Sequence, residues 1–576
     1  MTPEELFAEM QAAGELAPER LDDVARRLPD KVFIHYGEDG VKLTFAEFRD
    51  RTNAIAAGLH AMGLRRGQPV SVLTRNSLVA ALAMFAIWRA GGVYAPVNFN
   101  FTAPLLAYQL NDTAPFALIT DPSFAPLLAE VIGEVPLQRL VVHTPAPGDH
   151  DATDARFGPE FARLEITSLA ELAKTTAEPP PVVFRPLDPA NIVYTSGTTG
   201  PSKGVLQAFR WLNNYMHLMR RMTTPDDVIY CDLPLYHVGG AFFLLARAVW
   251  QGNTVGLWDR FSPNRFWDRI AECGASCCVL LDVMTPWLMS APPRPDDRAN
   301  TLNKVHMQPL PPNHHEVAQR FGFDFVTCGF GQTESGLGFA GLIDEFGDAE
   351  GTPARLWKGY DKATLRARCL ETGRPVIDGA GPVPKGFMGA PNPLYEVAIL
   401  DGDDNRLPPG AVGQLAFRPR YPGLLLLEYL GKPEATAKAL RTCWFHTGDA
   451  ARELPEAPGQ YAFVDRIGGF FRVRGENVSS YEVEALLARH EKVRAVAAVP
   501  VPAREGSEED VAVFVELMPG VAMDEDELRA HARKVLPRYM QPAHVRFVAA
   551  LPLTPTSKVE KYKLRRQILE ELGLTA

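Results

Sequence analysis

The first half of the chain alternates helix-like segments with short continuous apolar runs. Segment 43–63 reads as a helix that starts with a capping box formed by Thr44 and Glu47. Apolar runs and a further helix-like segment follow in turn at 69–74, 77–91 and 93–98. Buried strands that alternate with helices indicate a mainly parallel α/β architecture with helices on both faces of the sheet.

Two later segments refine this picture. Ser262 is expected to be the N-cap of a helix within 261–273, with Pro263 at its first position, and a buried strand follows at 277–281. Segment 338–384 is charged, rich in glycine and only weakly periodic. It is therefore expected to be a surface insertion.

The pattern changes near residues 465–470. Beyond this point, helix-like and strand-like segments suggest a small α+β unit of its own. The pair Gly468–Gly469 precedes this unit and can act as a swivel, although two glycines also suit an ordinary turn. The predicted organisation is a large α/β domain over 1–467 and a small, mobile α+β domain over 468–576.

Composition agrees with a globular protein of more than one domain. The chain has 576 residues, which is too long for a single hydrophobic core. Hydrophobic residues make up 46%, charged residues 22%, and the mean hydropathy is −0.09. The net charge of −10 argues against a general nucleic-acid-binding protein, which needs a basic surface. It still allows one local basic pocket for a phosphorylated small molecule.

Cysteines and apolar runs indicate a cytoplasmic location. The seven cysteines are scattered, so reduced thiols are expected. The group Cys273, Cys277 and Cys278 can be imagined as metal ligands, but its surroundings favour a helix end that runs into a buried strand. The longest apolar run, 78–88, is too short to cross a bilayer and suits a buried helix. The N-terminal residues show no signal-peptide pattern.

The stretch YTSGTTGPSKG at 194–204 carries the strongest chemical signal. Glycines let backbone N–H groups approach an anion, hydroxyls donate further hydrogen bonds, and Lys203 adds a positive charge. The spacing is not that of the common P-loop, because only two residues separate Gly197 from Gly200 and Lys203 precedes a glycine. On composition alone, a phosphate-binding loop is favoured over a mobile linker.

Four further stretches carry polar residues in unusual surroundings: LPLYHVGG (233–240), GFGQTES (329–335), WFHTGDAAR (444–452) and PLTPTSKVEKYKLR (552–565). Each has a structural alternative. His237 more often is a hydrogen-bonded core histidine, Glu334 and Asp449 more often serve turns or caps, and Lys558 is one of several lysines in a basic run.

Together, in this order and spacing, these stretches resemble the adenylate-forming superfamily, which includes acyl-CoA synthetases, luciferases and peptide-synthetase adenylation domains. The resemblance runs from the 93–98 strand to Lys558, and RGENVSSYEVE (474–484) looks most like the carnitine/crotonobetaine and fatty-acid CoA ligase branch. It implies an ATP-dependent acyl-CoA ligase. Such an enzyme joins a carboxylic acid to the α-phosphorus of ATP, releases pyrophosphate, and transfers the acyl group to coenzyme A.

The resemblance implies a set of ATP ligands. The expected ligands of the β- and γ-phosphates are Thr195, Ser196, Gly197, Thr198, Thr199 and Lys203. Glu334 is expected to bind Mg²⁺, which prefers carboxylate and phosphate oxygens, and Thr333 to contact the α-phosphate. Phe330 stands where these enzymes commonly use Tyr to stack on adenine, and Gly331 and Gln332 continue the same nucleotide-binding segment.

The remaining ATP contacts come from later in the chain. By resemblance, Asp449 accepts both ribose hydroxyls with help from Arg466. Lys558 bridges the α-phosphate and the substrate carboxylate and stabilises the transition state, so its loss is expected to cost roughly 3–4 kcal/mol. It must leave before the thiol enters, which explains a mobile domain. Relatives normally have Asp or Lys at the hinge position that Gly468 occupies here, so this hinge is less restrained.

The thiol and acyl sites are also implied by resemblance. The backbone around Arg474, Gly475 and Glu476 is expected to form part of the thiol tunnel. Arg472 and Arg474 are expected to contact coenzyme A phosphates, although arginines in a strand often simply face water. Residues expected around the acyl group are His237, which lies beside the carboxylate as a catalytic and gating residue, with Gly239, Met307, Gln308 and Gly336. The local Tyr236–His237 pair offers no carboxylate for an ammonium, which disfavours a free α-amino acid.

Two alternatives stay open at this point. Segment 338–384 follows the Glu334 motif, roughly where adenylate-only relatives carry an insertion, so a CoA-independent acyl-AMP ligase is the second hypothesis. A non-catalytic nucleotide-binding protein of the same fold is the third, and it is disfavoured because the catalytic groups are present. The identity of the acid is open, and a homodimer is possible because dimers are common in the resembled family.

Overall fold

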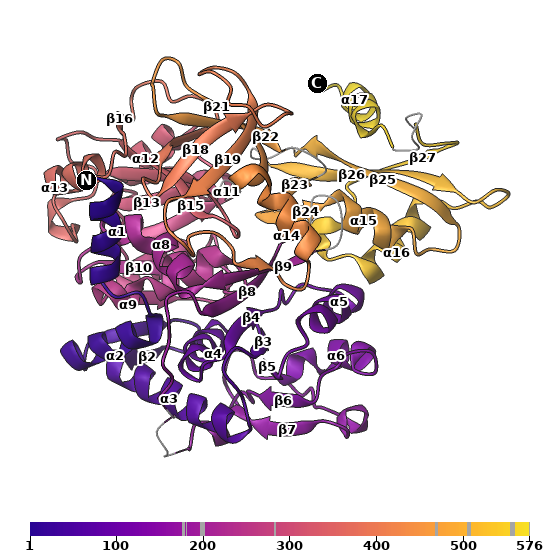
Figure 1. Cartoon of the computed structure of the whole chain (residues 1–576), viewed down its shortest axis with the longest axis horizontal. Coiled ribbons are helices and arrows are strands. Elements are labelled where there is room, and N and C mark those ends of the chain that lie inside the picture. The colour runs from indigo at the N-terminus through magenta and orange to yellow at the C-terminus, as the bar shows by residue number, and fades with distance from the viewer. Residues whose placement is uncertain are drawn as a thin grey trace.

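The computed structural model describes residues 1–175, 179, 181–195, 202–281, 284–466, 470–503, 508–552 and 559–574, with only the backbone at 465, 466, 470, 477 and 481. A large N-terminal part, coloured indigo to orange in Figure 1, carries a smaller yellow C-terminal part on one side. The predicted combination of a large α/β domain and a small C-terminal domain is confirmed.

One sheet of the large domain has eight strands in the order β20-β9-β8-β4-β3-β5-β6-β7. Their bounds are β3 Pro69–Leu73, β4 Val93–Pro96, β5 Ala117–Thr120, β6 Arg139–Val142, β7 Glu165–Ser168, β8 Pro189–Thr195, β9 Lys203–Ala208 and β20 Glu428–Tyr429. The strands from β8 to β7 along this order are parallel, whereas β9 and β20 run antiparallel at one edge. The parallel part matches the alternation in the sequence.

The second sheet has fourteen strands, in the order β18-β19-β21-β22-β17-β15-β14-β13-β12-β10-β11-β1-β2, with β16 beside β15. Their bounds are β1 Val32–Tyr36, β2 Val41–Thr44, β10 Val228–Cys231, β11 Thr254–Leu257, β12 Cys277–Leu281, β13 Lys304–Gln308, β14 Phe325–Gln332, β15 Gly336–Asp344, β16 Val376–Asp378, β17 Phe387–Pro391, β18 Tyr395–Leu400, β19 Gly413–Pro419, β21 Phe445–Glu453 and β22 Tyr461–Arg466. The strands from β1 to β14 along this order are parallel, and those from β15 to β18 are antiparallel. The sequence did not predict this antiparallel half.

Helices cover both sheets. Their bounds are α1 Pro3–Ala12, α2 Ala17–Arg27, α3 Phe45–Ala61, α4 Ser77–Arg89, α5 Ala103–Thr113, α6 Ala125–Val131, α7 Leu169–Leu172, α8 Phe209–Arg220, α9 Ala248–Gln251, α10 Phe266–Cys273, α11 Met284–Met289, α12 His314–Phe321, α13 Lys362–Leu370 and α14 Pro433–Ala439. The Thr44–Glu47 capping box at the start of α3 is confirmed. The apolar run 78–88 lies in α4 and is buried. Within the described chain, no helix combines the length and apolar character needed to cross a membrane.

The prediction for the start of α10 is wrong. The helix begins at Phe266, because Ser262 and Pro263 belong to the turn before it, and its N-cap is Arg265 without a side-chain cap. Cys273 ends this helix and Cys277 begins β12, as expected. All seven cysteines are described and unpaired. Among the described residues, no group of three or more potential ligands is arranged to hold a metal ion.

The predicted insertion at 338–384 is only partly an insertion. Its first residues, up to Asp344, form the end of β15, a strand that is buried throughout. Glycine is needed here because a Cβ on Gly338 would lie 2.5 Å from the ring of Phe417. The remaining excursion contains α13 and β16, which lie on the side of the molecule away from the small domain (Figure 1). Close packing explains the glycines of β15, Gly338 and Gly341, whereas Gly347, Gly359 and Gly373 have positive φ values that favour glycine.

The described part of the small domain contains a hairpin, a sheet, three α-helices and a short 3-10 helix, η6 Arg538–Met540. The hairpin pairs β23 Phe470–Val473 with β24 Glu476–Ser479. The sheet has the order β25-β26-β27, with β25 Val493–Pro502, β26 Glu509–Leu517 and β27 His544–Val548. The helices are α15 Ser480–Leu487, α16 Glu525–Val535 and α17 Lys561–Glu571. Apolar side chains on the two faces of this sheet form two separate hydrophobic cores.

The small domain contacts the large one through α5 and the segment that joins β4 to α5. Leu105 of α5 joins the apolar core between α15, α16 and the hairpin. The hydroxyl of Thr102 donates to the carbonyl of Val535 at 2.8 Å, and the Asn98 amide donates to the Tyr539 hydroxyl at 3.3 Å. These contacts fix one orientation of the small domain, with the tip of its β23–β24 hairpin directed into the large domain.

Candidate active site

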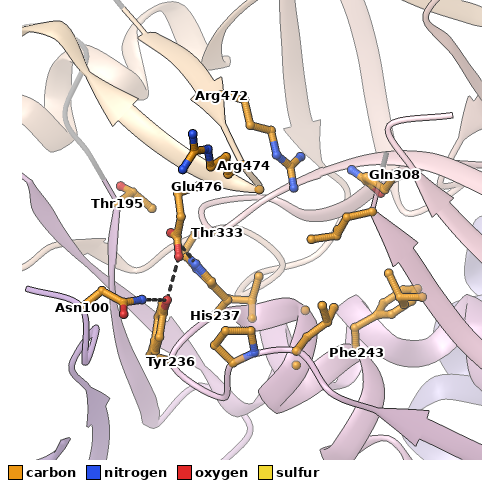
Figure 2. A pocket seen from close by; sticks show the side chains of 18 of the residues that line it. Asn100, Thr195, Tyr236, His237, Phe243, Gln308, Thr333, Arg472, Arg474 and Glu476 are labelled. Atoms are coloured by element: carbon orange, nitrogen blue, oxygen red, sulfur yellow. Dashed lines mark hydrogen bonds and ion pairs between the residues drawn. The ribbon is translucent and has the colours of Figure 1, made fainter. Parts of the chain in front are cut away.

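A cavity of about 1980 Å³ lies where the small domain meets the large one. Its walls come from the carboxyl ends of parallel strands, from the β14–β15 turn, and from the tip of the β23–β24 hairpin. Figure 2 shows Thr195 on one side of this space and Phe243 and Gln308 on the other, with Glu476, Thr333 and His237 between them. The carboxyl edge of a parallel sheet is where α/β proteins commonly bind ligands.

The end of the cavity where the sequence predicts phosphate binding is built by two neighbouring strands. Thr195 ends β8 and Lys203 begins β9, and the two are direct partners in the antiparallel ladder. The end of β8 and the start of β9 therefore lie side by side. Both residues line the cavity. The predicted ligands Ser196, Gly197, Thr198 and Thr199 lie outside the described residues.

Glu334 lies beside this pair. Its Oε1 accepts hydrogen bonds from the Tyr429 hydroxyl at 3.0 Å and from the Thr195 hydroxyl at 3.3 Å. The Lys203 ammonium lies 4.8 Å from the centre of the Tyr429 ring. Burial raises the pKa of the Glu334 carboxyl, against the opposing effects of its hydrogen bonds and of Lys203. Burial likewise lowers the pKa of Lys203, and the charge of Glu334 opposes this. The site thus places the carboxyl group of Glu334 and the ammonium of Lys203, both half-buried, around the same tyrosine.

The end of the cavity where the sequence predicts nucleoside binding is built by the β14–β15 turn and by β21. Gly331, Gln332 and Thr333 line the cavity together with Asp449. The Gln332 amide donates to Asp449 Oδ2 at 2.6 Å and to the Thr447 carbonyl at 3.0 Å, which fixes the turn against β21. The backbone of Arg466 pairs with that of Asp449 in the sheet, but the Arg466 side chain lies outside the described part. The predicted ribose-binding pair is therefore adjacent in the backbone.

Phe330 does not line the cavity. Its side chain is buried, and its ring lies 6.3 Å from that of Phe417 and 6.4 Å from that of Phe463, in nearly parallel orientation. The expected stacking surface for adenine thus lies behind the wall that Gly331 and Gln332 form. Neighbouring positions of a strand face opposite sides, so Phe330 points into the aromatic core while Gly331 faces the cavity. The register shifts after Phe330, and Gln332 lines the cavity as well.

The acyl end of the cavity contains some of the expected residues. His237, Gly239 and Gln308 line the wall, whereas Met307 and Gly336 do not. Met307 is fully buried in the core, because neighbouring positions of a strand face opposite sides. Gly336 has a positive φ of 65°, and a Cβ there would lie 3.4 Å from Tyr215. Leu337 lines the wall in its place.

His306 and Phe243 line the same wall and were not predicted. The His306 ring is bonded through Nδ1 to the Thr327 hydroxyl at 3.0 Å and through Nε2 to the Gln308 side-chain oxygen at 2.9 Å. Burial lowers the pKa of His306 to about 4, so the ring is neutral near pH 7. The signal that could have found it is the period of two in β13, which places residue 306 on the side of residue 308.

The hairpin tip closes the cavity between its two ends. Arg472, Arg474, Gly475 and Glu476 all line it. Arg474 and Gly475 have positive φ values of 52° and 83°, which make the tight turn between β23 and β24. A Cβ on Gly475 would lie 3.1 Å from Leu281, so the tip fits closely against the end of β12.

Glu476 connects the two domains inside the cavity. The Tyr236 hydroxyl donates to its Oε1 at 2.7 Å, and His237 Nε2 lies 2.8 Å from its Oε2 (Figure 2). Asn100 donates in turn to the Tyr236 hydroxyl at 3.2 Å. Burial acts to raise the pKa of Glu476, but the His237 and Tyr236 contacts outweigh it and lower the pKa overall. The sequence pattern identified this segment but not the role of its carboxylate.

The comparisons with known proteins agree with this geometry. The family model described as "AMP-binding enzyme" matches residues 21–424, and "AMP-binding enzyme C-terminal domain" matches residues 482–558. The chain belongs to the AMP-binding enzyme family. The resemblance to the adenylate-forming superfamily is thus confirmed.

Relatives in this family have CoA-ligase names. The medium/long-chain-fatty-acid–CoA ligase FadD6 of Mycobacterium tuberculosis is 29% identical over 560 residues, which covers 95% of this chain and 84% of the relative. The crotonobetaine/carnitine–CoA ligase of Proteus mirabilis is 26% identical over 533 residues, or 91% of this chain and 93% of the relative.

Solved structures share the fold. The o-succinylbenzoate CoA synthetase of Bacillus subtilis superposes with a TM-score of 0.73 at 20% identity, covering 95% of this chain and 98% of that one. The amide bond synthetase McbA of Marinactinospora thermotolerans gives 0.70 at 23% identity, covering 96% and 99%.

Two residues expected from the AMP-binding family lie outside the described part, the catalytic Lys558 and the hinge Gly468. Helix α17, which begins at Lys561, belongs to the small domain, where the Lys561 ammonium pairs with Glu484 at 2.6 Å. In the described chain, no residue beyond Glu476 lines the cavity. In this orientation the small domain therefore presents its hairpin tip, and not α17, to the cavity.

Proposed function

We propose that this member of the AMP-binding enzyme family is an ATP-dependent acyl-CoA ligase. It activates a carboxylic acid as an acyl-adenylate with release of pyrophosphate, and then transfers the acyl group to coenzyme A. The observation that carries this proposal is one continuous cavity that joins the Thr195–Lys203 phosphate end, the His306–Gln308 acyl end and the Arg474–Gly475 hairpin tip. The names of the relatives as CoA ligases support it.

In the first step, the carboxylate of the acid attacks the α-phosphorus of ATP. Lys203 and Thr195, with Ser196, Gly197, Thr198 and Thr199 of the same loop, hold the β- and γ-phosphates and stabilise the departing pyrophosphate. Thr333 and Lys558 contact the α-phosphate, where negative charge is shared with the incoming carboxylate. Because two anions must meet, positioning and charge neutralisation account for most of the rate.

Glu334 is suited to hold Mg²⁺. Its carboxylate is buried at the cavity wall, beside the Thr195 hydroxyl, and oxygen donors of this kind are those that Mg²⁺ prefers. When bound, Mg²⁺ neutralises phosphate charge during the displacement. The neighbouring Tyr429 hydroxyl keeps the Glu334 carboxylate oriented.

The nucleoside is held by residues from two strands. Asp449 accepts the ribose hydroxyls, and Arg466 assists from the adjacent strand. Gly331 and Gln332 form the wall for the base, with Phe330 supporting them from behind. The Gln332–Asp449 hydrogen bond at 2.6 Å holds these two parts of the site in register.

The second step requires the small domain to change its orientation. Lys558 acts in adenylation, whereas the orientation described here admits the thiol. Residues 1–467 and 468–576 move as two units about Gly468 between these two orientations. Arg474 and Gly475 then line the entry of the thiol, and Arg472 and Arg474 contact phosphates of coenzyme A. Glu476 holds His237 beside the acyl group in this orientation.

The acid binds between the strand ends and the helix after His237. This helix, η3 (Gly239–Ala246), is a π-helix that starts with two glycines at the cavity wall. A Cβ on Gly240 would lie 2.5 Å from the Pro234 carbonyl oxygen, which requires glycine there. The aromatic ring of Phe243 and the polar pair His306–Gln308 complete the wall. Fatty acids and carnitine-like acids, which the relatives' names print, are the first acids to test.

The CoA-independent alternative loses its support. None of residues 338–384, all of which are described, lines the cavity. The Glu371 carboxylate pairs with Arg221 at 2.6 Å, and the N-terminal ammonium donates to the Glu371 carbonyl, which ties this excursion to the large domain. It therefore lies where it does not block the hairpin tip.

The deciding experiment measures pyrophosphate release with ATP, Mg²⁺ and a panel of carboxylic acids, with and without coenzyme A. A ligase forms an acyl-CoA product and turns over many times only with coenzyme A. A burst of pyrophosphate that coenzyme A never accelerates, for every acid, would contradict the thioester step. Lys558→Ala tests the non-catalytic alternative, because a pure nucleotide binder has no turnover to lose.

Two further properties belong to this proposal. A cytoplasmic location is supported by the unpaired cysteines, six of which are buried or partly buried. A homodimer is supported only by resemblance to the family. Sedimentation of the full chain at several concentrations tests the dimer.

A further inference from the structure

We propose that the acid activated by this enzyme carries a second carboxylate at the far end of its acyl chain, and that the guanidinium of Arg247 binds this carboxylate. The substrates are then dicarboxylic acids. This inference rests on the proposed function, because it names the acid used in the same ligase reaction. Arg247 is a binding residue for the acyl end and does not touch the reacting carboxylate.

The guanidinium of Arg247 is buried without hydrogen bonds to satisfy it. Only 4% of the residue is exposed. Its Nε and Nη1 atoms are enclosed by the protein and have no hydrogen-bond partner among the described residues. Burying a charged donor in this way is costly, and the cost falls when an acceptor is supplied. The position of Arg247 therefore favours a ligand that brings acceptor oxygens.

Arg247 lies directly behind the wall at the acyl end of the cavity. It follows the π-helix η3, and its backbone N–H donates to the carbonyl of Phe242, five residues earlier, at 3.2 Å. Turns of this type are rare and are frequent at functional sites. The carbon of the guanidinium lies 5.2 Å from the centre of the Phe243 ring, and Phe243 lines the cavity. One side chain thus separates this charge from the acyl space.

Two further wall residues feel the charge of Arg247. Tyr215 of α8 and His306 of β13 both line the cavity. Burial raises the pKa of Tyr215, and the Arg247 charge opposes this. Burial lowers the pKa of His306 to about 4, and the Arg247 charge adds to this effect. The His306 ring also lies 4.9 Å from the Phe243 ring. Wall residues from three different elements therefore lie close to this guanidinium.

The buried charges near Arg247 include more cations than anions. Burial lowers the pKa of Arg247, and the charge of Asp227 is among those that oppose this. Asp227 is already paired with the Lys304 ammonium at 2.8 Å and accepts from the Ser276 hydroxyl at 2.6 Å. Two buried cations thus share one buried carboxylate. A carboxylate of the ligand would supply the second negative charge, because buried charges are stable only when they are paired.

This arrangement distinguishes between classes of acid. An alkyl tail at this end leaves the guanidinium without acceptors, and a trimethylammonium tail places a second positive charge beside it. A carboxylate can instead accept two parallel hydrogen bonds from a guanidinium. A site that hydrogen-bonds one substrate group rejects analogues that lack this group, because its own donors are then left unpaired. Fatty acids and carnitine-like acids are therefore expected to be poorer substrates than dicarboxylic acids.

The test compares matched acids on the full-length wild type. Straight-chain α,ω-dicarboxylic acids of increasing length are each paired with their monomethyl ester and with the monocarboxylic acid of equal length. The ester keeps the acceptor oxygens but removes the second charge. We expect kcat/KM for thioester formation with the best diacid to exceed that of both its partners by about 10- to 100-fold, as expected for hydrogen bonds to a charged group. Calorimetry with the same acids measures binding without turnover.

Arg247→Gln tests the residue itself. The variant is expected to lose the preference for the diacid, so that the ratio of kcat/KM between diacid and monocarboxylic acid falls by about 10- to 100-fold. A substitution that only destabilised the domain would lower both values and leave their ratio unchanged. Arg220→Gln is the matched control. Arg220 is equally buried over an aromatic ring, 4.7 Å from the centre of Trp250, and neither Trp250 nor its hydrogen-bond partner His217 lines the cavity.

Equal kcat/KM for the diacids and their partners, or the same ratio in Arg247→Gln as in the wild type, would overturn this inference while the ligase activity stands. If Arg247→Gln does not fold, the comparison of acids on the wild type decides alone. Binding of a diacid that Arg247→Gln abolishes, without thioester formation from any acid, would contradict only the proposed function. Neither binding nor turnover with any acid would overturn both.

Discussion

The carboxylate of Glu476 is expected to control the second half-reaction without affecting the first. It accepts from the Tyr236 hydroxyl at 2.7 Å and bonds His237 Nε2 at 2.8 Å across the domain boundary. A hydrogen bond to a charged group contributes about 1.5–3 kcal/mol. Glu476→Ala removes both bonds, so the docked orientation is expected to lose about 3 kcal/mol, or roughly two orders of magnitude in its population. Glu476→Gln keeps an acceptor for Tyr236 and is expected to lose about tenfold.

The assay separates the two half-reactions. Acyl-adenylate formation is followed by ATP–pyrophosphate exchange, and thioester formation by a single turnover of preformed acyl-adenylate with coenzyme A. We expect exchange to stay within about threefold of wild type, and thioester formation to fall about tenfold for Gln and about a hundredfold for Ala. Glu491→Gln controls for the loss of a negative charge from the same domain. Equal losses in both half-reactions, or equal effects of Gln and Ala, would refute the reasoning.

Three other changes test separate parts of the molecule. Lys558→Ala is expected to slow adenylation by two to three orders of magnitude, about 3–4 kcal/mol, with ATP affinity in equilibrium binding little changed; turnover close to wild type would remove this lysine from the reaction. Gly338→Ala places a Cβ 2.5 Å from the Phe417 ring, and we expect chemical denaturation to show a loss of about 1–3 kcal/mol, which an unchanged midpoint would contradict. Hydrogen bonding to Asp259, with further contributions from Asp39, raises the pKa of His150 to about 9, so its contribution to stability is complete below about pH 6.5 and is lost as pH rises through about 9. The difference in the free energy of unfolding between wild type and His150→Gln is expected to be about 1 kcal/mol at pH 6 for this partly exposed contact. The corresponding difference in melting temperature should therefore shrink between pH 6 and pH 10, and a constant difference would contradict the reasoning.

Much of the molecule follows from local features of the sequence. The capping box at Thr44 and the alternation of apolar runs with helices depend on residues close together in the chain, and both predict the parallel strands and helices correctly. The YTSGTTGPSKG, GFGQTES and WFHTGDAAR stretches were recognisable because each is a short run of consecutive residues. The family and the class of reaction therefore needed no tertiary information.

The tertiary structure decided which side chains meet. Sequence order does not show on which face of β13 residues 306–308 point, and the wrong choice put Met307 in the pocket and missed His306. The glycines in 338–344 led to the prediction of an exposed insertion, but in the structure they allow β15 to pack against large side chains. The contacts of Glu476 join residues more than 200 positions apart. The periodicity of apolar residues indicates only which positions of one element share a face. These contacts depend instead on how different strands and domains pack together.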